Sequence, residues 1–399
     1  MATSQNQTAR AAPIRSAEPV RARAGRVVRS LLGALRTHYP PFVLGLPVRR
    51  DSIPIFIYHD VEPACLARDL EFLRTNRYRT LSLAEFAAAA AAAKSGRAGH
   101  AESSGRCVLL TFDDARRNFH DSALPVLREF DARATLFAPS YWMGDPAPRT
   151  ADAEQFMTWE QLRSSAASGL VDVQSHAHRH ALVFSSDRLL DFANPRTLAD
   201  YDIYDWPMRI GCGGEELGRP APGTPIYAAT PLLSAERHFL ASPEVAMACV
   251  EHVSQDGGGD FFQRPDALTR LRRLHAARSR TSPGRFAEHS SLRALVASEF
   301  EHSRDLFRQH LGYAPQYLAF PWMMGSALSL DLAKAFGLKA VFGVALDFAR
   351  ARRPGLPVPA FGRLKSDWLP LLPGSGRGSF LAIAAGKVAG ISKTQHLAH

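Results

Sequence analysis

Residues 107–114 of this 399-residue chain read CVLLTFDD, an apolar and β-branched run that ends in two adjacent carboxylates. A short apolar run of this kind predicts a buried strand of a parallel sheet. Residues 171–180, VDVQSHAHRH, follow the same plan, because a strand-like run there ends in three histidines. Asp114 lies 62 residues before His176, which leaves room for a helix, a strand and a second helix between the two segments. Both segments are therefore expected to end at the same edge of one sheet.

The polar residues at these two strand ends are suited to a divalent metal. His176 and His180 are four residues apart, so a helical turn or a tight loop can place both imidazoles on one side. A catalytic zinc site uses three protein ligands and a water, and a carboxylate would complete the set. Since successive strand side chains point to opposite faces, Asp113 and Asp114 are expected to differ in role. One would bind the metal and the other would accept a proton from its water, which predicts a hydrolase.

Each motif has a simpler interpretation when it is taken alone. An isolated Asp-Asp pair is usually a turn or solvated surface, and an isolated His-x-x-x-His is usually a chance pair on a helix. The two motifs together, each at the end of a predicted strand, favour the metal site. His178, between the two ligand candidates, is expected to be a bystander.

Strand and helix patterns alternate over most of the chain. The predicted strands are residues 53–59, 78–83, 106–112, 134–138, 170–175, 316–320 and 340–344. Between them, helical patterns include the alanine-rich residues 84–94 and a segment that begins at Thr158, with Gln161 at the capping-box position. This alternation predicts an α/β fold with a parallel sheet, helices outside it and the site at the carboxyl ends of the strands. Periodicity alone does not distinguish a barrel from an open, doubly wound sheet.

The chain resembles the polysaccharide deacetylase family, carbohydrate esterase family 4. The resemblance is carried by residues 53–60, 78–83, 111–114 and 175–180. It implies a distorted, incomplete (β/α) barrel of about seven strands. It also implies that Asp113 is the catalytic base and that Asp114, His176 and His180 hold a divalent ion, expected to be Zn²⁺. The implied activity is removal of an N-acyl group, such as acetyl, from an amino sugar or a polysaccharide.

A third family motif, Arg-x-Pro-Tyr-Gly, is only partly present in residues 317–322, YLAFPW. Ala319 stands where the arginine would be, and Trp322 stands where the aromatic residue would be. The resemblance implies that the backbone N–H of Trp322 helps to hold the oxyanion, a role that does not depend on the side chain. The missing arginine leaves Asp113 without its usual orienting partner.

The histidine that serves as general acid in the family's last motif is absent from its expected place. His59, at the end of the first predicted strand, is the best substitute, although a structural imidazole at a strand end is an equal alternative. Arg363 could stabilise developing charge but cannot donate a proton at neutral pH. The candidate substrate-binding residues are Tyr58, Arg363 and Trp368.

The organisation expected from these patterns has four parts. Residues 51–180 and 291–370 would form the barrel, and residues 181–290 would form an inserted lid or substrate-selecting subdomain with elements of its own. Residues 1–50 would be an arginine-rich, unfolded arm, and residues 371–399 would be a C-terminal tail. The arginines between 270 and 280 in the insert could meet a phosphate or an acidic sugar, or could form one solvated helix face.

The formal net charge of +10 is concentrated in residues 1–50, which hold nine arginines and a single acid, Glu18. This leaves about +2 for the rest of the chain, which argues against a nucleic-acid groove on the folded part. The arm could instead contact an anionic membrane surface. Its apolar run is a poor match to a secretory signal or a transmembrane helix, so a cytoplasmic or peripheral-membrane location is expected. The four cysteines are widely spaced and indicate neither a zinc knuckle nor a disulfide framework.

The main functional hypothesis is thus a metal-dependent deacetylase whose partner is a free, polymeric or lipid-linked carbohydrate. One alternative keeps the fold and changes the reaction to O-deacetylation or to deformylation of a lipid-linked sugar. Another alternative is a non-catalytic carbohydrate-binding relative, which the missing arginine and histidine would favour and the intact metal motif would disfavour.

Overall fold

Strand β3 (Cys107–Phe112) lies inside a nine-stranded sheet in the computed structural model of this chain. The structure describes residues 40–48, 52–94, 106–144, 154–211, 214–343, 356–380 and Ile383. The strand order is β14-β13-β12-β5-β4-β3-β1-β15, with β2 paired to β3, and the pairs are all parallel. The other strands are β1 (Ile55–Tyr58), β2 (Arg79–Thr80), β4 (Ala134–Ala138), β5 (Val171–Ser175), β12 (Tyr317–Ala319), β13 (Ala340–Phe342), β14 (Ala360–Phe361) and β15 (Leu364–Lys365).

The two ends of this sheet lie close to each other. β14 is at one end of the strand order and β15 is at the other, yet only Gly362 and Arg363 separate them in the chain. Three Cα–Cα steps of 3.8 Å limit the distance from Phe361 to Leu364 to about 11 Å. The sheet must therefore curl on itself, and the chain forms the distorted, incomplete (β/α) barrel that was predicted.

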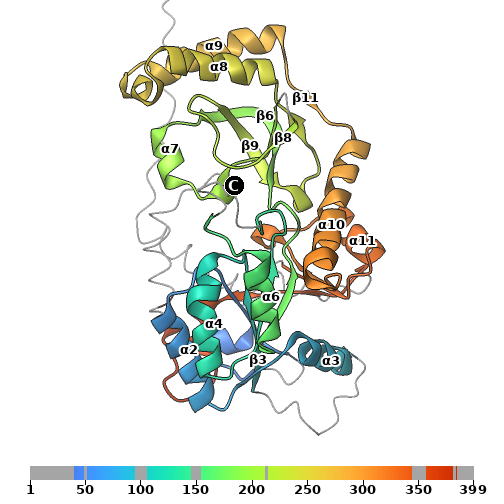
Figure 1. Ribbon diagram of the computed structural model, residues 1–399. Helices are drawn as coiled ribbons and strands as arrows, with labels where there is room; N and C mark the ends of the chain where they lie inside the picture. Colours follow the sequence, from blue (N-terminus) through green and yellow to red (C-terminus); the bar gives the residue numbers. More distant parts are fainter. Residues whose placement is uncertain are drawn as a thin grey trace, which may run out of the picture.

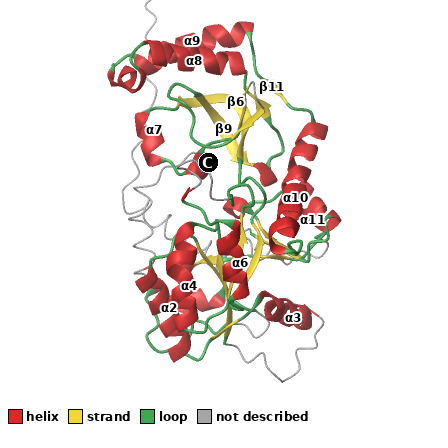
Figure 2. Ribbon diagram, viewed as in Figure 1, coloured by secondary structure: helices red, strands yellow, loops and turns green. Residues whose placement is uncertain are grey.

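Helices cover the outside of the sheet (Figures 1 and 2). They are α2 (Pro63–Thr75), α3 (Leu83–Lys94), the π-helix η2 (Phe119–Ala123) that continues into α4 (Leu124–Glu129), α6 (Trp159–Ala167), α10 (His289–Leu311) and α11 (Ala327–Ala335). Local sequence explains where several of them begin. Thr158 and Gln161 form the predicted capping box of α6, and Glu62 caps α2 by accepting hydrogen bonds from two backbone N–H groups.

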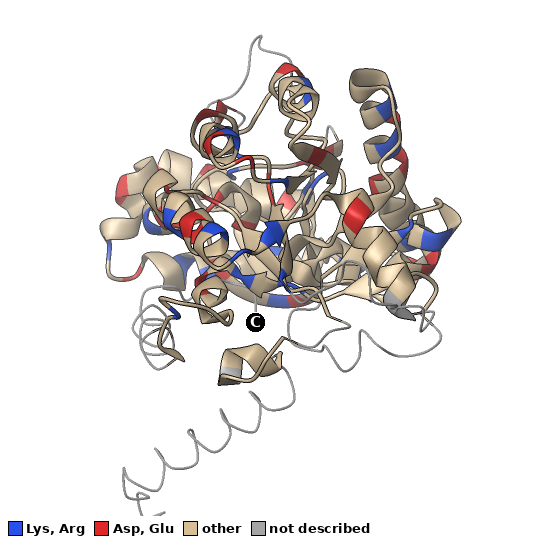
Figure 3. Cartoon of the chain, turned by 90° about the horizontal axis from the view of Figure 1, so that it is seen from below, with Lys and Arg blue, Asp and Glu red and all other residues tan. Residues whose placement is uncertain are grey.

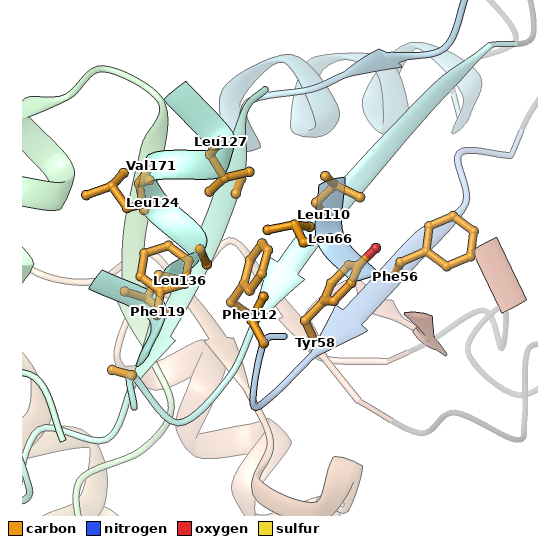
Figure 4. Close-up of a cluster of buried hydrophobic side chains, with 14 of the residues drawn as sticks. Phe56, Tyr58, Leu66, Leu110, Phe112, Phe119, Leu124, Leu127, Leu136 and Val171 are labelled. Atoms are coloured by element: carbon orange, nitrogen blue, oxygen red, sulfur yellow. The ribbon is translucent and has the colours of Figure 1, made fainter. Parts of the chain in front are cut away.

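The largest hydrophobic cluster packs α2, η2 and α4 against β1, β3 and β4 (Figure 4). Phe112 is fully buried, stacks on Tyr58 at 4.9 Å between ring centroids, and meets Phe119 edge-on at 5.0 Å. The last five residues of β3 are buried although successive side chains point to opposite faces, which is the pattern of a parallel strand covered on both sides. This packing fixes the end of β3, where the two aspartates follow.

Residues 181–290 contain their own secondary structure, above the barrel in the view of Figure 1. β6 (Leu182–Phe192) and β9 (Pro225–Pro231) form an antiparallel pair, as do β7 (Arg209–Gly211) with β8 (Gly214–Glu216) and β10 (Phe239–Leu240) with β11 (Arg285–Phe286). The helical elements are α7 (Pro195–Asp200), η3 (Ile203–Asp205), η4 (Leu232–Ser234), α8 (Pro243–Gln255), η5 (Gly258–Gln263) and α9 (Ala267–Thr281). A separate apolar cluster around Phe192, Cys249 and Phe261 joins β6 to the helices α8 and α9.

The segments at either end of the chain are described only in part. Residues 1–39 and 49–51 lie outside the described residues, so the predicted arm and its membrane contact are described only at residues 40–48. There, η1 (Pro41–Leu44) is structured rather than unfolded, because Phe42 and Val43 are apolar and bury in the main core. Of the predicted tail, the described residues 371–380 and Ile383 contact the barrel, and the ring of Phe380 stacks on Trp368 at 5.8 Å.

Charged residues of both signs are interspersed along the elements seen in Figure 3. No helix among the described residues combines the length and apolar composition needed to cross a bilayer.

Candidate metal centre

The carboxyl ends of neighbouring strands bring the predicted site residues together. The N–H of Asp113 donates to Tyr58 O at 2.9 Å, and the N–H of His176 donates to Ala138 O at 2.9 Å, so each residue extends the pairing of its strand. Asp114, Ala177 and His180 have φ angles of 70°, 65° and 51°. Such left-handed conformations cost about 1–3 kcal/mol each for residues other than glycine and cluster at functional sites. The two loops therefore hold conformations that the local sequence alone would not favour.

Asp114, His176 and His180 form a buried cluster whose ligand atoms lie within 4.8 Å of one another. His176 Nε2 is 3.4 Å from Asp114 Oδ1, and His180 Nε2 is 3.5 Å from the same oxygen. Metal–ligand bonds of about 2.1 Å at tetrahedral angles place ligand atoms about 3.4 Å apart. Asp114 Oδ1 is buried and has no hydrogen-bond partner among the described residues. The spacing and this unsatisfied oxygen both fit a divalent cation between the three side chains.

The ring orientation of His176 is fixed by the barrel itself. His176 Nδ1 is 2.8 Å from the carbonyl oxygen of Ala319, at the end of β12. Because a carbonyl oxygen can only accept, Nδ1 carries the N–H, and in the neutral ring Nε2 is the unprotonated nitrogen directed to Asp114, which is the usual arrangement of a metal-binding imidazole. Ala319, which replaces the family arginine, thus takes part in the site through its backbone.

Asp113 is held by an arginine that the sequence did not identify as its partner. Arg363 is fully buried between β14 and β15, and its Nη1 and Nη2 donate to the two carboxylate oxygens of Asp113 at 2.6 and 2.8 Å. Nη1 also lies 3.3 Å from the Thr111 hydroxyl. The sequence predicted that Asp113 lacks an orienting partner, and this is wrong, because closure of the barrel brings Arg363 to it from elsewhere in the chain.

The electrostatics of the cluster favour a cation between Asp114, His176 and His180. Burial raises the pKa of Asp113, but the Arg363 charge outweighs it, so the pKa lies below its usual value. Burial also opposes ionisation of Asp114, yet the approach of the His176 ring at 3.4 Å and the neighbouring His180 imidazole hold its pKa well below the usual range. Burial lowers the pKa of His180 to about 3, so its imidazole is neutral, as a metal ligand must be.

Two further predicted residues border the cluster. Trp322 follows β12, is half-buried with a φ of 51°, and its ring centroid lies 4.3 Å from that of His180. His59 follows β1, is exposed, and lies beside the strand end that carries Asp113, because Tyr58 pairs with Phe112. The structure therefore gathers His59, Trp322, both aspartates and both ligand histidines at one edge of the sheet.

The three predicted substrate-binding residues are buried instead of lining an open surface. The Tyr58 hydroxyl donates to Asp69 at 2.8 Å, and its ring lies in the main core. Trp368 belongs to the same core, and Arg363 is committed to Asp113. Substrate contact by these side chains remains a prediction that their burial does not support. His178 is also buried, with Nδ1 2.9 Å from the Ser140 hydroxyl, outside the ligand cluster.

One aromatic neighbour of the site, Tyr204, was not predicted from any sequence motif. This residue belongs to η3 of the insert and stacks on His180 at 3.8 Å between ring centroids. Arg116, two residues after Asp114, lies over the Tyr204 ring at 4.8 Å and pairs with Asp202 at 2.7 Å. The Tyr204 hydroxyl is buried without a hydrogen-bond partner among the described residues. The insert thus forms part of the wall of the metal centre.

Comparison with known proteins places this site in a family context. The family model "Polysaccharide deacetylase" matches residues 100–200, which include Asp113, Asp114, His176 and His180. The poly-β-1,6-N-acetyl-D-glucosamine N-deacetylase of Escherichia coli K12 is 29% identical over 126 residues. That match covers 30% of this chain and 18% of the relative, so the similar segment is a small part of the longer protein. The predicted resemblance to polysaccharide deacetylases is confirmed.

Comparison with solved structures found deacetylases of low sequence identity. The BpsB deacetylase domain from Bordetella bronchiseptica is 17% identical with a TM-score of 0.47, and the match covers 80% of this chain and 97% of that domain. IcaB from Ammonifex degensii is 18% identical with a TM-score of 0.45, covering 84% of this chain and 96% of its own.

Proposed function

We propose that this chain, which shares the polysaccharide deacetylase motifs, is a metal-dependent hydrolase that removes N-acetyl groups from an amino-sugar polymer. The observation that carries the proposal is that the two adjacent carboxylates, Asp113 and Asp114, have different partners. Asp114 Oδ1 faces two imidazole nitrogens, whereas both oxygens of Asp113 are held by Arg363. One aspartate is therefore suited to bind an ion and the other is suited to move a proton.

Asp114, His176 and His180 would hold the divalent ion, which we expect to be Zn²⁺ from the two nitrogen donors and one oxygen donor. An ion bound there would supply Lewis acidity towards an acyl oxygen and would lower the pKa of a water. The three residues are each less than a tenth exposed.

Asp113 is the proposed general base. Arg363 holds its carboxylate in one orientation and keeps its pKa low, so that it is ionised at neutral pH and ready to accept a proton. Its Oδ2 lies 3.5 Å from His176 Nε2, so the base borders the ligand cluster without belonging to it. The proton that it accepts is that of the water attacking the acyl carbon.

Two groups on neighbouring strand ends would complete the reaction. The backbone N–H of Trp322 is proposed to donate a hydrogen bond to the oxyanion that develops when water adds to the acyl carbon. His59 is proposed to protonate the departing amine nitrogen, because it is exposed and directly follows β1, beside the end of β3 from which the aspartates extend. Its alternative role as a structural imidazole is less consistent with this exposure.

The insert, residues 181–290, is proposed to lie over the metal site and to determine which substrate reaches the ion. Tyr204 and the Arg116–Asp202 ion pair support this role, because they join the insert directly to the ligand His180 and to the loop after Asp114. The E. coli relative is named for a β-1,6-linked polymer of N-acetylglucosamine, and this polymer is the first substrate to test. A lipid-linked sugar is the second.

The experiment measures acetate and free amine released from a β-1,6-linked oligomer of N-acetylglucosamine, together with the metal content of each protein. We expect wild-type protein to carry about one ion and to release acetate and amine in equal amounts. Asp113→Asn should keep the ion and lose about 10²–10⁴-fold in turnover, the usual contribution of a general base. Asp131→Asn, the same change at an exposed position before β4, at the opposite end of the sheet from the site, is the matched control and should retain full activity.

Two results would count against the proposal. Wild-type turnover in Asp113→Asn would remove the base assignment. Acetate release from an O-acetylated sugar, without free amine from the N-acetylated oligomer, would favour the O-deacetylase alternative.

A further inference from the structure

Glu299, on α10, is a buried acid that none of the proposed chemical steps uses. Its residue is 1% exposed, so its charge must be compensated by close partners. Oε2 accepts the backbone N–H of His178 at 2.9 Å and that of Arg179 at 2.8 Å. Oε1 accepts from the Arg179 guanidinium at 2.6 Å. The carboxylate therefore accepts three hydrogen bonds, all from residues of one loop.

That loop is the segment that carries both histidine ligands, His176 and His180. The two N–H groups held by Glu299 lie between the ligands, next to Ala177 and His180, which have left-handed φ angles of 65° and 51°. A loop in such conformations needs fixed anchor points if it is to present two imidazoles at one spacing. Glu299 holds the loop through the N–H groups of His178 and Arg179. Ser303, one turn later on α10, holds its start through a 2.8 Å contact with the Ser175 hydroxyl.

Arg179 extends the same anchor to the insert. Its Nη1 reaches Glu299 and the Ser298 hydroxyl at 2.6 and 3.1 Å, while Nη2 pairs with Glu215 of β8 at 2.8 Å. The guanidinium thus joins α10, the ligand loop and the insert. Arg179 is itself only 7% exposed, and replacing Glu299 would leave its guanidinium with Glu215 and Ser298 alone. The buried N–H groups of His178 and Arg179 would lose their acceptor.

We propose that Glu299 is a positioning residue that holds the loop between His176 and His180 in the shape that binds the metal. It acts through the backbone of His178 and Arg179 and touches neither the ion nor the substrate. Replacing a residue that orients metal ligands through hydrogen bonds typically lowers metal affinity 10–100-fold. The inference rests on the metal site of the proposed function, but it makes a separate claim about affinity.

The test is a zinc titration of metal-free protein in competition with a chromophoric chelator, after circular dichroism has shown that each apoprotein is folded. In Glu299→Gln the amide can accept from only one side and places an NH₂ group towards Arg179 or the loop. We expect this variant to bind zinc about 10–100-fold more weakly than wild type. Glu301→Gln, on the exposed side of the same helix, is the matched control and should bind zinc as wild type does.

A second variant keeps the test decisive if Glu299→Gln does not fold. Glu299→Asp retains the charge beside Arg179 but withdraws the carboxylate from the loop by about 1.5 Å, one C–C bond. It should weaken zinc binding roughly tenfold. Equal affinity of wild type and either folded variant would overturn the inference and leave the proposed function intact. Absence of zinc binding by wild type would overturn both.

Discussion

Arg363→Met should destabilise the fold far more than the loss of an ordinary ion pair. Arg363 is fully buried, Asp113 is 3% exposed, and two hydrogen bonds of 2.6 and 2.8 Å join them. Methionine fills a similar length of space but leaves the carboxylate buried and unpaired. Removing one partner of such a pair costs about 3–5 kcal/mol, whereas an exposed pair contributes about 0–1 kcal/mol. Burial therefore sets the expected loss at about 3–5 kcal/mol.

The assay is denaturant unfolding of the metal-free protein at pH 7, so that ion binding does not add to the measured stability. Arg133→Met is the matched control, because Arg133 forms an exposed 3.6 Å pair with Glu85 and its loss should cost about 1 kcal/mol or less. The double variant Arg363→Met/Asp113→Asn removes both charges. We expect its loss of stability to be about 0.5–3 kcal/mol smaller than the sum of the two single losses.

A loss below about 1 kcal/mol in Arg363→Met would refute the reasoning. Exact additivity in the double variant would refute it as well, because the two side chains would then not stabilise each other. If the reasoning holds, Arg363→Met should also lose turnover when reloaded with metal, since the base is no longer held in one orientation.

Two other predictions concern Asp69 and Trp322. Burial raises the pKa of Asp69 to about 6, so its charge opposes folding above pH 6, and stability is regained as the pH falls from 6 towards 4. Asp69→Asn should therefore gain about 1–3 kcal/mol in denaturant unfolding at pH 8 and lose this pH dependence; a less stable variant at pH 8 would contradict the assignment. Trp322→Gly keeps the backbone N–H and suits the φ of 51°, so turnover at saturating substrate should stay within about tenfold of wild type. A loss of about 10²–10³-fold would show that the side chain, and not the N–H, carries the role.

The sequence predicted the metal centre because each of its parts is local. Asp113 and Asp114 directly follow one apolar strand, and His176 and His180 follow another, so parallel pairing alone brings the four residues to one edge. The barrel was predictable from the alternation of strands and helices together with the family resemblance. When a buried strand is fixed in the sheet, the position of the polar residues that directly follow it is fixed as well.

The surroundings of the centre depend on contacts that no local pattern encodes. Arg363 reaches Asp113 across 250 positions of the chain because β14 and β15 close the barrel, whereas the family motif led us to expect an arginine at Ala319. Tyr204 lies in an insert whose path over the site follows from tertiary packing. Tyr58 and Trp368 were predicted to bind substrate, but both side chains are buried in the main hydrophobic core.

The central claim is that Asp113 moves a proton and does not hold the ion. The most direct measurement is the ratio of acetate turnover to bound metal in Asp113→Asn beside wild type, on the N-acetylated oligomer proposed above. We predict one ion per chain in both proteins and a turnover per ion that is about 10²–10⁴-fold lower in the variant. Loss of the ion together with the activity would make Asp113 a ligand, and unchanged turnover per ion would remove it from the reaction.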